Sequence, residues 1–339
     1  MHESIDLGTM VATSDTAPHA IFLAESIKAC GGRWAEAGIN ILLPFTGEES
    51  IENTPTESLS AGTRDSVGDR MALLRNAPAV RTYPFPLRAE GPWPNFPFRD
   101  KVHAAAEAER ISAASGSQML LWLDVDSFFL RAPTSAGGTE EGSLMESFLP
   151  NGAMFAARPV DKCLIGSRAD DPVDGFWTGL YAHFGLAPDD VPAFRTVLDR
   201  ISIRSYWNAG FLAVRPEAGL LRAWAENFEI LSKRGPILTQ CRTSARHALF
   251  LHQAVLAVTV LSRTKASQRR LLDARYAQPL HLREESSPRV PTRDAISCRY
   301  DTFFHDPDVL VPDLPETLAK LLDVNRTSLD LPWHYDMTP

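Results

Sequence analysis

The feature that most constrains the fold is an apolar run over residues 119–123, Met-Leu-Leu-Trp-Leu, which ends in Asp124, Val125 and Asp126. Because every side chain in the run is large and apolar, it predicts a strand covered on both faces, as in a parallel sheet between layers of helices. Open α/β sheets bind ligands just past the carboxyl ends of such strands. The run therefore predicts a central strand with a ligand site at its end.

The two aspartates after this strand predict a metal site. If the backbone stays extended there, Asp124 and Asp126 project to the same side. Two close carboxylates repel each other, and a divalent cation relieves the repulsion while leaving coordination positions for phosphate oxygens. We therefore interpret the pair as a site for Mn²⁺ or Mg²⁺ and a diphosphate. The alternative is a pair of turn-forming aspartates that close the strand.

The rest of the chain predicts an α/β fold. A strand over 7–13, a helix with Pro18 in its first turn and a strand over 39–43 form a βαβ unit. Prolines from 84 to 97 exclude regular structure, and a helix over 101–115 leads into the central strand. Other strands are expected over 79–83, 152–158, 201–214, 271–282 and 296–305, and other helices over 70–76, 174–184, 216–231, 245–261 and 315–324.

Composition and charge limit the classes of function. The chain has 339 residues, 44% hydrophobic and 22% charged, enough for a sizeable core. Its net charge of −8 gives no reason to expect a nucleic-acid partner. The first residues lack a signal-peptide pattern, and the longest apolar stretch, 249–261, is too short and too polar to cross a bilayer. The four cysteines are far apart, which predicts reduced thiols, so we expect a cytoplasmic protein with no transmembrane segment.

Three segments carry a resemblance to a known family. Residues 123–126, Leu-Asp-Val-Asp, preceded by a helix that carries Lys101, resemble the D-x-D segment of GT-A-fold glycosyltransferases. Residues 206–212, Tyr-Trp-Asn-Ala-Gly-Phe-Leu, resemble the Phe-Asn-Ala-Gly-Val-Leu segment of glycogenin-like and lipopolysaccharide galactosyltransferase-like enzymes. His252-Gln253 stands where those enzymes have Asp-Gln.

This resemblance implies one GT-A-like (Rossmann-like) domain over residues 1–339, with a mixed, mostly parallel sheet flanked by helices. Residues 1–133 would bind the nucleotide, and residues 134–339 would shape the sites for donor sugar and acceptor. The implied enzyme is a metal-dependent hexosyltransferase. It would move a sugar from a nucleotide-diphospho-sugar to a glycan, lipid or protein acceptor.

The metal ligands implied by the resemblance are Asp124, Asp126 and a late histidine. His305 fits the order along the chain, with His281 as the rival. The family's fuller His-x-x-Gly-x-x-Lys-Pro-Trp signature is absent, so the histidine is assigned on its order alone.

Three further residues would meet the nucleotide. Thr13 and Ser14, after the first strand, would help to hold the nucleobase, whereas helix capping explains Asp15 and Thr16 at least as well. Lys101 begins a helix, where the dipole disfavours a cation, so an anion such as the diphosphate is expected nearby. The alternative for Lys101 is a solvated side chain.

The candidate residues at the donor sugar are Asn208 and Gln253, which we group with Asp126 as catalytic. Gly210 permits a close backbone approach, and Asn208 could then hydrogen-bond a sugar hydroxyl through both its donor and its acceptor. Gln253 would reach the donor sugar, or else be a buried amide with a structural partner. His252 replaces an aspartate of the family, so the role of that aspartate does not carry over.

Two other classes of function stay open. A haloacid-dehalogenase-type phosphatase would use Asp124 as nucleophile and Asp126 as acid and base. It would need a paired-acid loop, for which 170–171 and 189–190 are candidates, although neither follows an apolar strand. A catalytically silent sugar-nucleotide-binding protein would keep the same metal site. The aromatic side chains over 174–184 are expected in the core, or else as a platform for sugar rings.

Overall fold

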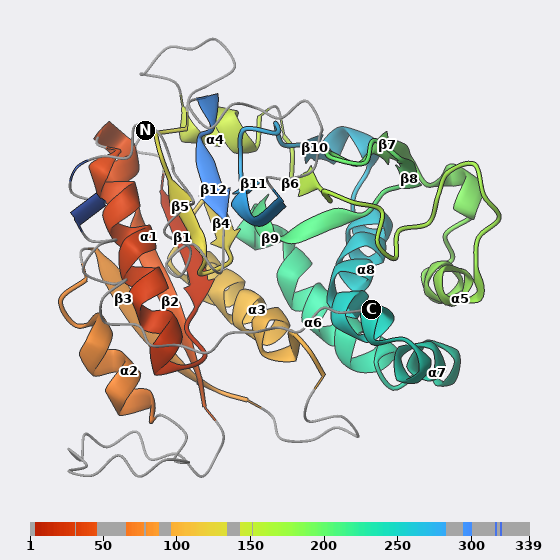
Figure 1. Ribbon diagram of the computed structural model, residues 1–339, viewed down its shortest axis with the longest axis horizontal. Coiled ribbons are helices and arrows are strands. Elements are labelled where there is room, and N and C mark those ends of the chain that lie inside the picture. Colours follow the sequence, from red (N-terminus) through yellow and green to blue (C-terminus); the bar gives the residue numbers. More distant parts are fainter. Residues whose placement is uncertain are drawn as a thin grey trace.

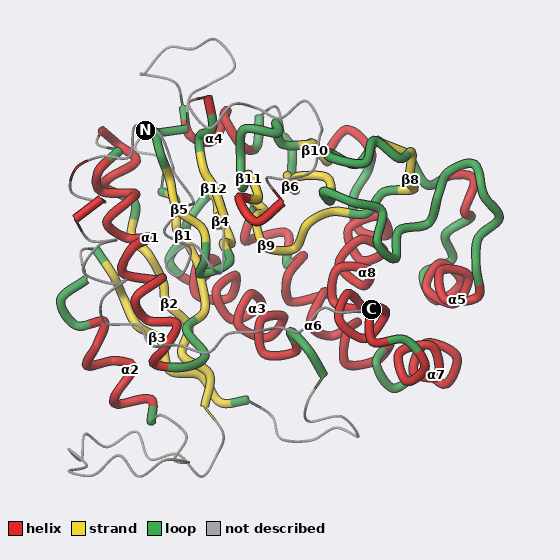
Figure 2. Tube along the Cα trace, in the orientation of Figure 1, coloured by secondary structure: helices red, strands yellow, loops and turns green. Residues whose placement is uncertain are grey.

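A seven-stranded sheet runs through the molecule, and helices cover both of its faces (Figures 1 and 2). The computed structural model describes residues 4–30, 32–45, 66–77, 79–87, 96–133, 143–150, 152–282 and 294–299, with 316, 319 and 320 beyond them. The strand order is β10-β6-β9-β4-β1-β2-β3, and neighbours are parallel except where β9 pairs with β4 and β6. The predicted α/β fold with a mixed, mostly parallel sheet is confirmed.

The strands of this sheet are β1 (Ile5–Met10), β2 (Gly38–Phe45), β3 (Val80–Pro86), β4 (Met119–Leu123), β6 (Phe155–Pro159), β9 (Trp207–Val214) and β10 (Arg269–Leu271). The helices are α1 (Ala17–Ala29), α2 (Val67–Leu74), α3 (Arg99–Ala114), α4 (Leu144–Phe148), α5 (Gly175–His183), α6 (Leu220–Leu231), α7 (Gly235–Thr243) and α8 (Ala245–Arg263). A three-stranded sheet joins β11 (Gln278–Pro279), β12 (Ser297–Arg299) and β5 (Ser127–Phe129), and β7 (Ala193–Arg195) pairs with β8 (Ser202–Arg204).

The strand β4 is the one that the apolar run predicts, with the same bounds, and it separates two cores. Leu120 and Trp122 belong to the core that also contains side chains of α3, α6 and α8. Met119, Leu121 and Leu123 belong to the core that contains side chains of α1. Because successive side chains of a strand point to opposite faces, a strand between two cores has no place for a polar side chain.

The reversed direction of β9 decides which residues meet at one edge of the sheet. The strands β1, β2, β3, β4 and β6 end at this edge, called here the carboxyl edge, and β9 begins there. Helix α3 lies between the parallel strands β3 and β4 in the chain, so its first turn is at the carboxyl edge as well. The opposite edge, where those strands begin, is called the amino edge.

Two prolines inside strands correct the predicted boundaries. The sequence predicts that Pro44 closes a strand and that Pro84 begins an irregular segment. Instead, β2 continues through Pro44 to Phe45, and β3 continues through Pro84 to Pro86. In the described part of the sheet β3 is the last strand, so a proline there removes no hydrogen bond from a second neighbour.

Helix α8 is apolar nearly all round because it is a core helix. Residues 251–261 are all buried. Of the described helices it alone is long and apolar enough to cross a membrane by length and composition, and 61% of the apolar window is buried inside the protein. The aromatic side chains of α5 are also in the core: Phe176, Trp177 and Tyr181 are at most 3% exposed, so the alternative of a sugar platform there is wrong.

Candidate functional site

The chain turns sharply at the two aspartates. After Asp124 the backbone makes a turn at 125–126, and Ser127 donates its N–H to the carbonyl of Asp124 at 3.0 Å. The extended backbone on which the sequence argument depends is therefore not present. Asp124 and Asp126 are nevertheless both close enough to Arg299 to act on its charge. Both carboxylates are thus within electrostatic range of Arg299, with a turn and not an extended strand between them.

Lys101 forms a buried ion pair with the first aspartate. Its Nζ lies 2.5 Å from Oδ1 of Asp124, and its side chain is 7% exposed. The helix dipole disfavours a cation in the first turn of α3, and burial adds a desolvation cost. The carboxylate of Asp124 offsets both effects. The alternative of a solvated lysine is therefore wrong, and an anion does lie beside this helix start.

Gly210 lets β9 approach the carboxylate of Asp124. The backbone N–H of Asp124 donates to the carbonyl of Gly210 at 2.7 Å, so the two residues face each other across β4 and β9. A Cβ at Gly210 would overlap Oδ2 of Asp124. Any residue other than glycine would displace the carboxylate. The predicted close approach is confirmed, and the group that comes close is a candidate metal ligand.

Asn208 turns its side-chain oxygen toward the backbone. Its Oδ1 accepts a hydrogen bond from the N–H of Gly210 at 2.7 Å, and the residue is 7% exposed. Its Nδ2 is then the better placed group for a ligand hydroxyl, since it donates only. The contact with a sugar stays a prediction, and we expect it to use Nδ2.

Both ends of the Gln253 side chain bond to the protein. Its Oε1 accepts from the N–H of Ala209 at 3.1 Å, and its Nε2 donates to the hydroxyl of the buried Tyr206 at 3.0 Å. These bonds fasten α8 to the start of β9 and so help to position Asn208. They match the structural alternative for Gln253, while its contact with the donor sugar stays a prediction.

His252 is buried beside Lys101 and is neutral. Its Nδ1 lies 2.9 Å from the carbonyl of Leu249, so this nitrogen carries the proton and donates. Burial lowers the pKa of His252 well below its ordinary value, and the charge of Lys101 lowers it further, although the Leu249 carbonyl opposes both. A neutral imidazole cannot supply the charge of the aspartate that the family has here. The ring of Phe98 packs on it, with centroids 4.6 Å apart.

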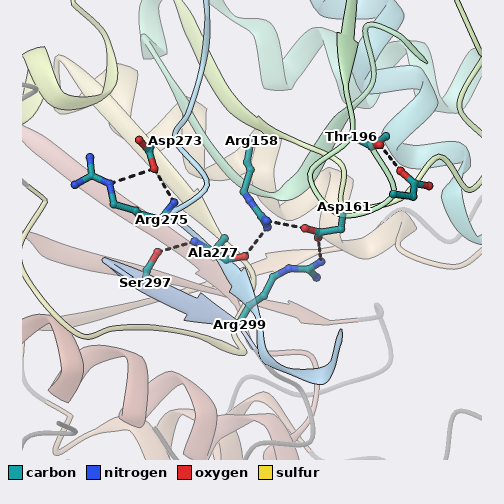
Figure 3. A network of polar contacts seen from close by, with 9 residues as sticks. Arg158, Asp161, Thr196, Asp273, Arg275, Ala277, Ser297 and Arg299 are labelled. Carbon is teal, nitrogen blue, oxygen red and sulfur yellow. Dashed lines mark hydrogen bonds and ion pairs between the residues drawn. The ribbon is translucent and has the colours of Figure 1, made fainter. Parts of the chain in front are cut away.

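Two arginines share one aspartate at the carboxyl edge (Figure 3). Arg158, at the end of β6, lies 2.6 Å from Oδ1 of Asp161 and also donates to the carbonyl of Ala277 at 2.7 Å. Arg299 of β12 donates to Oδ2 of Asp161 at 3.0 Å. Burial opposes the charge of Arg299, but Asp161 and then Asp126 and Asp124 outweigh it and raise its pKa. The trio keeps one net positive charge, which faces the two aspartates after β4.

The loop after β1 is held in place at the same edge. Thr13 and Ser14 lead from β1 into α1, and Thr16 donates its hydroxyl to the carbonyl of Thr13 at 2.8 Å. Arg70 of α2, 2% exposed, donates to the carbonyl of Ala12 at 2.8 Å. It also donates to a carbonyl at the end of β2 at 2.9 Å and so ties the two strand ends together. The role of Thr13 and Ser14 at the nucleobase stays a prediction.

The two candidates for the third metal ligand are His305 and His281. His305 lies outside the described residues. His281 belongs to a short 3₁₀ turn, Leu280–Leu282, of which the backbone alone is described at that position. Within the described part of the chain, no group of three or more His, Cys, Asp or Glu side chains could hold a metal ion.

The donor atoms at the carboxyl edge fit a hard divalent cation. Mg²⁺ prefers oxygen ligands and is commonly bound by one or two carboxylates together with the phosphates of a substrate, and carboxylates suit Mn²⁺ as well. Asp124 and Asp126 are a donor set of this kind. A cation bound to Asp124 would share its carboxylate with Lys101.

Sequence reasoning missed four residues of this region: Arg158, Asp161, Arg299 and Phe98. Arg158 and Asp161 stand at and just past the end of the predicted strand 152–158, as Asp124 and Asp126 follow theirs. Charged residues at or just past the end of each predicted strand are the signal that could have identified Arg158 and Asp161. Arg299 depends on the pairing of β12 with β5, for which the sequence holds no local signal.

No protein-family model and no curated protein matches this chain. Among solved structures, it is similar to the galactosyltransferase LgtC in complex with donor and acceptor sugar analogs, with 12% identity and a TM-score of 0.43 over 94% of this chain and 95% of that one. It is also similar to an active site mutant of LgtC, with 13% identity and a TM-score of 0.45 over the same shares. A third match is the apo bifunctional glycosyltransferase WbbM, with 11% identity and a TM-score of 0.42 over 96% of this chain and 45% of that one. These three structural neighbours are glycosyltransferases.

Proposed function

We propose that this chain is a metal-dependent glycosyltransferase, of the hexosyltransferase type, that moves a sugar from a nucleotide-diphospho-sugar to an acceptor. The observation that supports this most is the meeting of two carboxylates, Asp124 and Asp126, with two cations, Lys101 and Arg299, at the carboxyl edge. The four groups come from α3, β12 and the turn after β4. A metal ion needs the carboxylates and a diphosphate needs the cations, so one small region provides for both.

The four charges balance one another in the protein alone, because two carboxylates face two cations. Asp124 and Asp126 would hold the metal ion, and Lys101 and Arg299 would then be available to the diphosphate oxygens. The chemistry that the ion supplies when bound is Lewis-acid neutralisation of the diphosphate leaving group. Burial fixes Lys101, and the ion pair with Asp161 fixes Arg299. Both cations are therefore oriented before the substrate arrives. Cations oriented in advance stabilise developing negative charge without a cost of reorganisation.

The donor sugar would lie toward β9. Asn208 presents Nδ2 at the start of this strand, and Gly210 keeps the space beside Asp124 free of a side chain. A sugar hydroxyl bonded to Nδ2 would place the sugar next to the diphosphate that the carboxylates and cations bind.

The phosphatase alternative gains no support. Its paired-acid loops, 170–171 and 189–190, lie around β7 and β8. There Arg204 donates to the carbonyls of Asp171 at 3.2 Å and Pro188 at 3.3 Å. The acid just past the end of β6, Asp161, is instead bound by two arginines.

Calorimetric titration of UDP and GDP, each with MnCl₂ and with a chelator, tests the proposal. We expect one nucleotide to bind at least about tenfold more tightly with Mn²⁺, a difference of about 1.4 kcal/mol. Asp124→Asn should remove the difference, whereas Asp273→Asn, at an exposed aspartate paired with Arg275, should keep it. Equal affinity with and without metal would reject the metal bridge, and no binding of either nucleotide would reject the donor class.

Release of the nucleoside diphosphate from the matching nucleotide-sugar separates a transferase from a silent binding protein. A transferase releases it faster when glycan, lipid or protein acceptors are supplied. Tight binding without release under any of these conditions would favour the silent binding protein.

A further inference from the structure

Phe98 is the one aromatic residue in the described part of the chain that is exposed. It is 41% exposed, whereas every other described Phe, Tyr and Trp is buried or half-buried. An aromatic ring in contact with water gives up the favourable free energy that its burial would supply. Exposure of this ring to solvent therefore costs the fold free energy.

The backbone of Phe98 is also held in an unfavourable conformation. Immediately before α3 it has φ 59° and ψ 13°, in the left-handed region that bulky side chains avoid. Its carbonyl accepts the N–H of Val102 at 3.1 Å, so this conformation is part of the start of the helix. Strain of this kind gathers at functional sites, where the surrounding structure imposes it.

The neighbours of Phe98 belong to the candidate site. Its ring packs on the ring of His252 with centroids 4.6 Å apart. The Nζ of Lys101 lies 5.2 Å from its centroid, and the same nitrogen is 2.5 Å from Asp124. Lys101 thus contacts both the exposed ring and the carboxylate of Asp124. Lys101 and His252 fix the ring, and the rest of its surface faces solvent.

We propose that the exposed surface of Phe98 is a platform for the apolar C–H face of a pyranose ring. The proposal rests on the glycosyltransferase function proposed above. It specifies which part of the substrate contacts the start of α3. A pyranose carries its hydroxyls around the rim and C–H groups on its faces, and an aromatic ring is complementary to such a face. The sugar comes from the donor or from the acceptor, and its contact with Phe98 is the same in both.

Saturation-transfer NMR on the full chain detects the contact directly. The probes are methyl β-D-glucopyranoside, methyl β-D-galactopyranoside and lactose, each with and without UDP and MnCl₂. We expect transfer to the ring C–H protons of at least one sugar in the wild type, reduced at least about fivefold in Phe98→Ala and kept in Phe98→Tyr. Equal transfer in the wild type and Phe98→Ala, or none in the wild type, would overturn the platform.

Substitution by glycine separates recognition from folding. Phe98→Gly removes the ring and relieves the positive φ, so it should melt at or above the temperature of Phe98→Ala while losing sugar contact to the same extent. Ala79→Gly, at φ 54° and at the amino edge, measures the effect of the backbone alone. Ile230→Ala, at a 48% exposed side chain of α6, measures the loss of an exposed apolar group. Both controls should keep the sugar signal, and a loss in Ile230→Ala equal to that in Phe98→Ala would also overturn the platform.

The affinities of UDP and UDP-galactose identify the source of the sugar. If the donor sugar lies on Phe98, Phe98→Ala lowers the affinity for UDP-galactose but not the affinity for UDP. If the acceptor sugar lies there, Phe98→Ala removes the NMR contact with lactose and leaves both nucleotide affinities unchanged. Either result supports the platform. Absence of binding of both UDP and GDP in the wild type would reject the proposed function, and the free sugars would still report on Phe98.

Discussion

The two edges of the central sheet are built in opposite ways. At the amino edge, residues from the starts of β1, β2 and β3 line a cavity of about 290 Å³. Asp6, Glu36 and Arg81 are among the residues that line it, and Asp6 accepts hydrogen bonds from the hydroxyls of Ser117 at 2.6 Å and Ser115 at 3.4 Å. At the carboxyl edge, ionised groups from separate elements meet: Lys101 with Asp124, and Arg158 and Arg299 with Asp161.

The difference lies in the partners that the charged groups have at each edge. Hydroxyls complete the hydrogen bonding of Asp6, and they come from one stretch of chain, 115–117. The carboxyl edge instead draws its charges from α3, β6 and β12 and the turn after β4, and keeps them partly buried, at a desolvation cost. Such a cost is typical of sites that bind or transform a ligand. We therefore propose that the functional site is at the carboxyl edge and not at this cavity.

Replacing one carboxylate at each edge by an amide should give the largest difference between the two edges. Asp126→Asn would remove a charged ligand of the proposed metal ion, so we expect sugar transfer to fall at least about a hundredfold. The fold should survive, because relieving two close carboxylates does not destabilise. Asp6→Asn should keep transfer and cost about 1 kcal/mol of stability through weaker bonds to its serines. Turnover and thermal melting of both variants measure this, and equal losses of activity would remove the distinction between the edges.

Gly210→Ala should disturb both stability and the site. The new Cβ would overlap Oδ2 of Asp124, so the carboxylate or β9 must move, at a cost of about 1–3 kcal/mol and with weaker binding of Mn²⁺. Gly179→Ala is the matched control inside α5, since its Cβ would meet nothing nearer than Ile237 at 3.8 Å. It should stabilise by about 0.5–1 kcal/mol. Urea unfolding with metal titration checks both, and an unchanged metal affinity in Gly210→Ala would separate Asp124 from the metal.

Arg299→Lys should have a smaller effect, confined to binding. Lysine keeps the charge but offers one compact donor group, so it cannot hold Asp161 and remain directed at the diphosphate as a planar guanidinium can. We expect the affinity for the nucleoside diphosphate to fall about tenfold. Arg275→Lys, in an exposed pair with Asp273, should change it little. Calorimetry on both variants decides this, and equal affinities would place Arg299 outside the ligand's reach.

The parts of the site that the sequence predicted are those that follow from local pattern. The strand β4 and the two aspartates after it are contiguous, and the resemblance pointed to Lys101, Asn208 and Gly210. The sequence left the turn at 125–126 open as an alternative, because an extended chain and a turn are equally compatible with Asp-Val-Asp. In the structure the two carboxylates share a neighbouring charge, Arg299, although a turn and not a strand lies between them.

The parts that could not be predicted depend on long-range pairing or on backbone angles. Arg299 reaches the site because β12 pairs with β5, across more than a hundred residues of intervening chain. The positive φ of Phe98 could not be predicted, because glycine is the residue type that indicates such a backbone angle in a sequence. The prolines of β2 and β3 were misjudged for a similar reason, since whether a proline is tolerated depends on which strand lies beside it.

Helix α3 connects the two edges, and its start is held by an ion cluster that can be titrated. At the carboxyl edge, Arg99 and His103 of α3 lie 2.8 and 2.9 Å from Oε1 of Glu229, and Lys233 lies 3.2 Å from Oε2. The helix ends at the amino edge, near Ser115. Acid should therefore loosen the site end of α3 through Glu229.

The smallest expected effect is the pH dependence that Glu229 supplies. Burial alone would raise its pKa, but the bonds from His103, Arg99 and Lys233 outweigh burial and lower the pKa from 4.5 to about 2. Because the folded pKa is the lower one, the stabilisation is complete above pH 4.5 and is lost as the pH falls toward 2. Glu229→Gln should flatten the free energy of unfolding across this window, whereas Glu226→Gln, at an exposed position of the same helix, should keep the slope of the wild type. Urea unfolding at several pH values between 2 and 6 measures the slopes, and equal slopes in all three proteins would show that Glu229 does not hold the start of α3.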